Sequence, residues 1–208
     1  PGTYYLDEPM SYSNGQSIKN SDSRYLGMIT MRVALSRSRN IPALQAFQSV
    51  DKDKIASFVN SLGINYGDTL YESASIGSFD TVSALQMSAA YGTYARGGYY
   101  IEPYSYTRIT YRDNNEVKEK SYQKEKVCSE KTAKYINDIL LYAIKYGKIL
   151  GTLEVGNAEV AGKTGTTTID RAKTDALGIS EYSVLDSWAC IYSHDYSISL
   201  WYGYDEVT

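Results

Sequence analysis

Apolar residues in the first half of the chain recur at helical spacing and are divided by turn residues. Within the stretch 27–36, Met28, Ile29 and Val33 are spaced as on one face of a helix. Later segments show the same period, and glycines close two of them. The predicted helices are Gly27–Ser36, Pro42–Val50, Asp51–Leu62 ended by Gly63, and a fourth that begins near a cap at Asp80 or Thr81 and stops at Gly97 and Gly98.

The second half changes to alternating polar and apolar positions, with one long helix inserted. Thr107–Arg112 and Glu116–Glu119 flank an Asp-Asn-Asn turn and predict a surface hairpin. Ser129 begins a helix that continues to about Gly147. Three strands are predicted at Ala158–Thr166, Ser187–Ser193 and Ser197–Tyr204, with Thr167–Leu185 as the longest loop. Because only a short turn joins the last two strands, they are expected to pair antiparallel, in an α+β protein.

Composition narrows the classes of function. The chain has 208 residues, of which 43% are hydrophobic, which is enough for one sizeable core. Its formal net charge of −3 argues against nucleic-acid binding, because a phosphate-binding surface requires an excess of Lys and Arg. No apolar run approaches the ~18 residues of a membrane span, so any membrane anchor is expected outside this chain.

Cysteine and histidine offer little chemistry. Cys128 and Cys190 are too few for a disulfide framework and lie in no metal-ligand spacing. The one histidine, His194, lies between two predicted strands. It is interpreted as a turn residue rather than a catalytic base.

The stretch Lys163-Thr164-Gly165-Thr166 is the first candidate for chemistry. On a strand, Lys163 and Gly165 share one face, and Thr164 and Thr166 share the other. A glycine lets a substrate backbone lie against the strand, and the free N–H groups of an edge strand can bind an extended peptide. The alternative is an edge strand with no such role.

Ser38-Arg39-Asn40 is the second candidate and carries little information alone. It lies between two predicted helices, where a polar turn commonly caps the helix that follows. Asn40 as an N-cap is therefore the alternative to a catalytic role.

Together, in this order and context, the two motifs resemble those of penicillin-binding proteins. The segment 27–43 around Ser38 is similar to the second motif of the bifunctional, class A, Gram-positive-like members, and Lys163-Thr164-Gly165 to the third. Further similar segments are Asp7-Glu8-Pro9, 83–103, Asp186-Ser187-Trp188 and 201–205. The resemblance thus covers nearly the whole chain.

The resemblance implies a helical cluster packed on a five-stranded antiparallel sheet, here truncated at both ends. The family's nucleophile lies in a Ser-x-x-Lys motif, expected roughly twenty residues before Pro1. The strings Ser49–Lys52 and Ser121–Lys124 both follow Ser38, which is the wrong order, and neither is taken as the nucleophile. Residues 1–208 are therefore interpreted as a partial transpeptidase domain: a mainly helical part at 1–105, a hairpin at 106–128, and the long helix with the sheet at 129–208.

The resemblance also assigns roles to residues. Ser38 would relay a proton to the leaving amine, and Asn40 would hold the substrate amide. Lys163 would position Ser38 and attract the substrate's terminal carboxylate. Thr164 and Thr166 on either side of Gly165 would bind that carboxylate, with the Thr166 N–H forming half of an oxyanion hole.

The implied activity is a peptidoglycan D,D-transpeptidase on the extracytoplasmic face of the bacterial membrane. Its partners would be stem peptides ending in D-Ala-D-Ala, β-lactams and an upstream glycosyltransferase domain. The implied reaction needs no metal or other cofactor, and this chain alone is expected to be inactive. Two alternatives stay open: a carboxypeptidase or β-lactamase that uses water as the acceptor, and a non-catalytic cell-wall-binding scaffold. The long segment 167–185 and the helix around Tyr91, which resembles that of the bifunctional members, favour the transpeptidase.

Overall fold

A three-stranded antiparallel sheet forms one layer of the computed structural model, which describes residues 1–78, 82–147, 156 and 158–204. The strand order is β11–β10–β9, and Trp188 of the central strand lies opposite both Gly165 and Trp201. The described residues thus form three of the five strands that the resemblance implies. The strands are β9 (Ala161–Thr168), β10 (Val184–Tyr192) and β11 (Ser197–Gly203), and His194 lies in the short turn joining the last two, as predicted.

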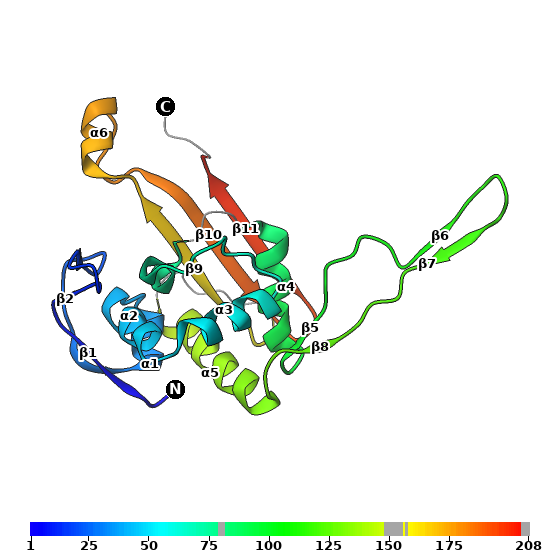
Figure 1. Ribbon diagram of the computed structural model, residues 1–208, viewed down its shortest axis with the longest axis horizontal. Coiled ribbons are helices and arrows are strands. Elements are labelled where there is room, and N and C mark those ends of the chain that lie inside the picture. Colours follow the sequence, from blue (N-terminus) through cyan, green and yellow to red (C-terminus); the bar gives the residue numbers. More distant parts are fainter. Residues whose placement is uncertain (79–81, 148–155, 157, 205–208) are drawn as a thin grey trace.

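Two helices pack on this sheet: α4 (Ala84–Ala95) against β10 and β11, and α5 (Glu130–Tyr146) against β9 (Figure 1). Ser129 caps α5 and Gly147 ends it, as the sequence predicts. Leu140, Ala161 and Tyr192 are buried between helix and sheet. This interface therefore fixes the position of β9, because α5 packs along its first residues.

A second group of helices comes from the first half of the chain, and three of its four members were predicted in outline, whereas η1 was not. It contains α1 (Met31–Ser36), α2 (Asn40–Gln48), α3 (Lys52–Ser61) and the 3₁₀ helix η1 (Glu72–Ile76). Ile18, Ile41 and Leu44 form a separate buried cluster beneath α2. Because α1 also packs on α5, the turn between α1 and α2 is held next to β9.

One predicted helix begins too early. Gly27–Thr30 forms strand β4, which pairs antiparallel with β1 (Tyr4–Asp7), and the helix starts only at Met31 after Thr30 as N-cap. A short apolar run does not distinguish a strand from a helix, and here residues 27–30 form a strand because they pair with β1. Two further short strands, β2 (Met10–Ser11) and β3 (Ser17–Ile18), pair with each other.

The predicted loop at Thr167–Leu185 is also corrected. Strand β9 runs on to Thr168, β10 begins at Val184, and between them lies α6 (Arg171–Leu177). Asp170 caps this helix and Gly178 ends it in the left-handed conformation. Asp80 and Thr81, expected to cap α4, lie outside the described residues, and the N-cap of that helix is Ser83.

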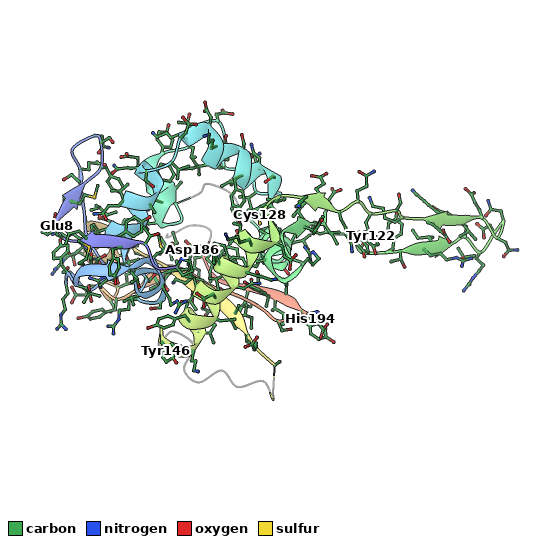
Figure 2. All side chains as sticks on the ribbon, turned by 90° about the horizontal axis from the view of Figure 1, so that it is seen from below. Glu8, Tyr122, Cys128, Tyr146, Asp186 and His194 are labelled. Carbon is green, nitrogen blue, oxygen red and sulfur yellow. The ribbon has the colours of Figure 1, made fainter. Side chains whose placement is uncertain are left out.

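The predicted surface hairpin is confirmed and extends away from the rest of the chain (Figures 1 and 2). Its tip pairs β6 (Arg108–Thr110) with β7 (Val117–Glu119), and its base pairs β5 (Tyr99–Tyr100) with β8 (Glu125–Lys126). Figure 2 shows Tyr122 on this arm, far from the labelled Asp186 of the sheet. Within the described ranges, no helix has both the length and the apolar character needed to cross a bilayer.

Candidate active site

The two sequence motifs meet in the structure. Lys163, on β9, donates a hydrogen bond from Nζ to Ser38 Oγ at 3.0 Å, although 125 residues separate them. The same ammonium group donates to the carbonyl oxygen of Thr164 at 2.8 Å. A lysine and a serine hydroxyl are thus in direct contact at the junction of the helical part and the sheet.

Ser38 adopts a backbone conformation that is unusual for a residue other than glycine. Its φ is +52°, in the left-handed region, and its N–H donates to Leu35 O at 3.0 Å as α1 ends. A side chain in this conformation costs about 1–2 kcal/mol. In this strained conformation the hydroxyl of Ser38 is exposed and faces Lys163.

Asn40 is the first residue of α2 rather than its N-cap. The N-cap position is occupied by Arg39, whose side chain makes no capping bond. The backbone N–H of Asn40 donates to Asn20 Oδ1 at 2.8 Å, and its Nδ2 donates to Lys19 O at 2.7 Å. The capping alternative is therefore wrong, and one amide N–H and Oδ1 of Asn40 make no hydrogen bond to the described residues.

Burial changes the chemistry of Lys163. Removal of water from around the ammonium group lowers its pKa from 10.5 to about 8. No acidic side chain of the described residues forms a salt bridge with it. The group is consequently a cation that an incoming carboxylate would stabilise.

The three residues after Lys163 lie along a strand edge. Because the sheet ends with β9, every second residue of this strand directs its N–H and C=O away from β10. Gly165 and Thr166 are exposed, and Thr164 is half-buried. A Cβ added at Gly165 would meet only Trp188 Cβ, at 3.5 Å, so this face of the strand is open. Among the described residues, the hydrogen bonds of Asn40 go to Asn20 and Lys19 and not to Thr164 or Thr166.

A buried polar cluster behind the motif was missed from the sequence. The Arg39 guanidinium extends inward, where its Nε donates to Asp7 Oδ2 at 2.8 Å, and both side chains are almost fully buried. Asn20 is buried beside them. One available signal was an arginine placed between two site residues.

The two Ser-x-x-Lys strings lie away from this site. Ser49 caps the C-terminus of α2 and donates to Ala46 O, and Lys52 begins α3. Ser121 and Lys124 lie between β7 and β8, in the second half of the hairpin arm. Neither serine contacts Lys163, in agreement with their rejection as nucleophiles. Among the described residues, no three His, Cys, Asp or Glu side chains gather as metal ligands would.

Comparison with known proteins identifies the family of this chain. A family model described as "Penicillin binding protein transpeptidase domain" matches residues 1–195. The chain belongs to this family. The resemblance to class A penicillin-binding proteins is thereby confirmed, as is the α+β fold.

Curated relatives carry names of the same class. The chain is 40% identical over 205 residues to "Penicillin-binding protein 1A/1B" of Bacillus subtilis, covering 96% of this chain and 22% of that protein. It is 31% identical to "Penicillin-binding protein 1A" of Streptococcus pneumoniae, covering 97% of this chain and 29% of that protein. The chain thus spans between a fifth and a third of these relatives.

Solved structures of penicillin-binding proteins share the fold. PonA1 from Mycobacterium tuberculosis superposes with a TM-score of 0.80 at 17% identity, covering 99% of this chain and 55% of that one. Penicillin-binding protein 1A from Haemophilus influenzae gives 0.77 at 21% identity, covering 99% and 35%. At these identities the likeness concerns the fold.

Proposed function

We propose that this penicillin-binding domain is part of a peptidoglycan D,D-transpeptidase acting on stem peptides that end in D-Ala-D-Ala. The single observation that carries the proposal is the 3.0 Å contact between Lys163 Nζ and Ser38 Oγ beside an open strand edge. Such a contact can position a hydroxyl for proton transfer, and the neighbouring strand edge can bind an extended peptide.

The proposed reaction proceeds through an acyl-enzyme. A serine hydroxyl attacks the carbonyl carbon of the penultimate D-Ala, the peptide bond breaks, and the terminal D-Ala leaves as an amine. Ser38 passes the proton to that leaving nitrogen. The amine of a second stem peptide then attacks the ester, forms the new amide and releases the serine. β-lactams would acylate the same serine.

The remaining residues bind the substrate in this proposal. The Lys163 ammonium, with Thr164 and Thr166, holds the terminal carboxylate, and Asn40 holds the substrate amide. The N–H of Thr166 supports the oxyanion, where loss of one donor typically costs about 3 kcal/mol of transition-state stabilisation. Gly165 leaves room for the peptide backbone, because little lies near a Cβ at that position.

The proposal places the nucleophile in a Ser-x-x-Lys segment outside residues 1–208, and residues 1–208 as one part of a transpeptidase domain. A glycosyltransferase domain would precede it, and the protein would be anchored to the membrane with this domain on the extracytoplasmic face. No cofactor is required by this chemistry.

The test is labelling with a fluorescent penicillin. The full-length protein is compared with residues 1–208 alone and with the full-length protein whose upstream Ser-x-x-Lys serine is changed to alanine. Labelling of the unaltered full-length protein alone supports the proposal. Absence of labelling in all three would favour a scaffold without catalysis, and labelling of residues 1–208 would show that the nucleophile lies within them. Rapid loss of the label to water would favour a hydrolase.

A further inference from the structure

We propose that Arg39 is a positioning residue of this site, acting through its two chain neighbours Ser38 and Asn40. The inference rests on the proposed function and identifies the buried contacts that hold the Ser38-Arg39-Asn40 motif in place. Arg39 itself is not placed to touch substrate, since its guanidinium is buried against Asp7.

The support is a closed ring of hydrogen bonds. Arg39 Nε donates to Asp7 Oδ2 at 2.8 Å, and Asn20 Nδ2 donates to Asp7 Oδ1 at 2.7 Å. Asn20 Oδ1 in turn accepts from the backbone N–H of Asn40 at 2.8 Å. Because Asn40 follows Arg39 in the chain, the ring closes through the peptide bond between them. The backbone direction at the start of α2 is therefore fixed from two sides.

The ring leaves little freedom for another side chain at position 39. Nη1 of Arg39 donates to both carboxylate oxygens of Asp22, at 2.9 and 3.0 Å, and Nη2 donates to Arg24 O. Asp7, at 0% exposure, also accepts from the N–H of Leu26. A planar guanidinium can meet these acceptors at the same time, whereas a lysine ammonium cannot match the fork.

The same ring supports the strained conformation of Ser38. Because φ at Ser38 is +52°, relaxing this residue would lower the free energy of the chain. Contacts of the next residue must therefore hold the strained conformation in place. Arg39 does so with its backbone N–H bonded to Ala34 O at 2.9 Å and its side chain anchored to Asp7. Releasing the anchor lets Ser38 turn away from Lys163. Misplacement of a reacting group by about 1 Å can cost 10²-fold in rate.

The experiment measures acylation of the full-length protein by fluorescent penicillin at saturating concentration, together with the thermal unfolding midpoint. Arg39→Lys keeps the buried charge and removes the fork. Asp22→Asn keeps the Arg39–Asp7 pair and weakens the half-exposed outer contact to Arg39, together with the hydrogen bond that Asp22 Oδ1 accepts from the Arg24 N–H. Arg32→Lys is the matched control, because Arg32 lies in α1, the helix that precedes Ser38, and pairs with an aspartate, Asp138, outside the ring.

The expected result is a fall of about tenfold or more in the acylation rate constant of folded Arg39→Lys, with penicillin affinity before acylation nearly unchanged. Asp22→Asn should fall by about threefold, and Arg32→Lys should behave as the wild type. A rate constant for Arg39→Lys within about twofold of the wild type, with only a lowered unfolding midpoint, would show a merely structural role.

Three outcomes separate a failure of the inference from a failure of the proposed function or of folding. If Arg39→Lys is unfolded at the assay temperature, Asp22→Asn decides, and an unchanged acylation rate there overturns the inference. A wild-type full-length protein that never labels overturns the proposed function and this inference with it. Normal labelling of the wild type with equally fast labelling of Arg39→Lys overturns the inference alone.

Discussion

The two sides of the candidate site are built in different ways. The helical side carries Ser38 on a strained turn that a buried ring of charged and amide side chains supports. The sheet side carries Lys163 to Thr166 on a regular strand that backbone pairing with β10 supports. A tight turn has no ladder of repeating hydrogen bonds, so its geometry depends on particular side chains. A strand position depends instead on what fits against its neighbours.

This difference predicts how each side fails. On the helical side, replacing a charged side chain by one of the same charge and a different shape should reduce activity more than stability. On the sheet side, a larger side chain should cost stability where the strand packs closely against its neighbours, and should hinder substrate binding where the strand is open. The following experiments test this contrast from the largest expected effect to the smallest.

Lys163→Met should have the largest effect, because Lys163 joins the two sides. Acylation of the full-length protein by penicillin should fall by about 10²- to 10⁴-fold, since the contact to Ser38 and the carboxylate-binding cation are both removed. Unfolding free energy should rise by about 1 kcal/mol at neutral pH, because a desolvated charge is replaced by an apolar side chain of similar length. Denaturant melts and labelling rates measure the two changes, and an active Met variant would contradict the assigned role.

The pKa of Lys163 gives this comparison a pH dependence. Because the folded pKa, about 8, lies below the ordinary 10.5, the unfolded chain binds more protons between these values and stability rises with pH there. The gain in unfolding free energy from Lys163→Met should therefore be largest below pH 8 and should shrink as pH approaches 10.5. Penicillin binding by the wild type should weaken as pH rises through about 8. A stability difference that does not change with pH would show that Lys163 has an ordinary pKa.

Ser38→Ala and Ser38→Gly separate the hydroxyl from the strain. Both should reduce acylation by about 10²-fold, because neither can relay a proton. Ser38→Gly should be more stable than Ser38→Ala by about 1 kcal/mol, since glycine adopts a φ of +52° without a steric penalty. Paired unfolding curves and labelling rates test this. Equal stabilities would show that the turn relaxes when Ser38 is replaced.

Gly165→Ala and Gly162→Ala test the sheet side at two positions of one strand. A Cβ at Gly162 would meet Cys190 O at 2.4 Å, so that variant should lose about 2 kcal/mol or more of stability. A Cβ at Gly165 meets only an ordinary contact at 3.5 Å, so folding should be unaffected while labelling slows by about tenfold. If Gly165→Ala labels at the wild-type rate, the substrate backbone does not lie against this residue.

His194→Ala should have the smallest effect. Figure 2 shows His194 at the turn between β10 and β11, and its ring contacts the adjacent Asp195. An exposed turn residue usually contributes within about 0.5 kcal/mol, and labelling should stay at the wild-type rate. Slowed labelling by this variant would indicate that the turn takes part in the site.

Much of the fold followed from local patterns. The ends of α3 and α5, the surface hairpin and the final pair of strands agree with the predictions, because caps, glycines and alternation act over a few residues. The prediction of a helix over 27–30 was wrong because strand pairing with residues 4–7 is a long-range event. Helix α6 was missed because a short polar segment carries no clear apolar period.

The sequence by itself determined the motif residues, their order and the family to which the chain belongs. Only the tertiary structure showed that Lys163 meets Ser38, that Ser38 is strained, and that Arg39 is held by Asp7 and Asn20. The physical reason is that local propensity depends on neighbours in the chain, whereas burial, pKa and hydrogen-bond partners depend on segments that meet only when the chain folds.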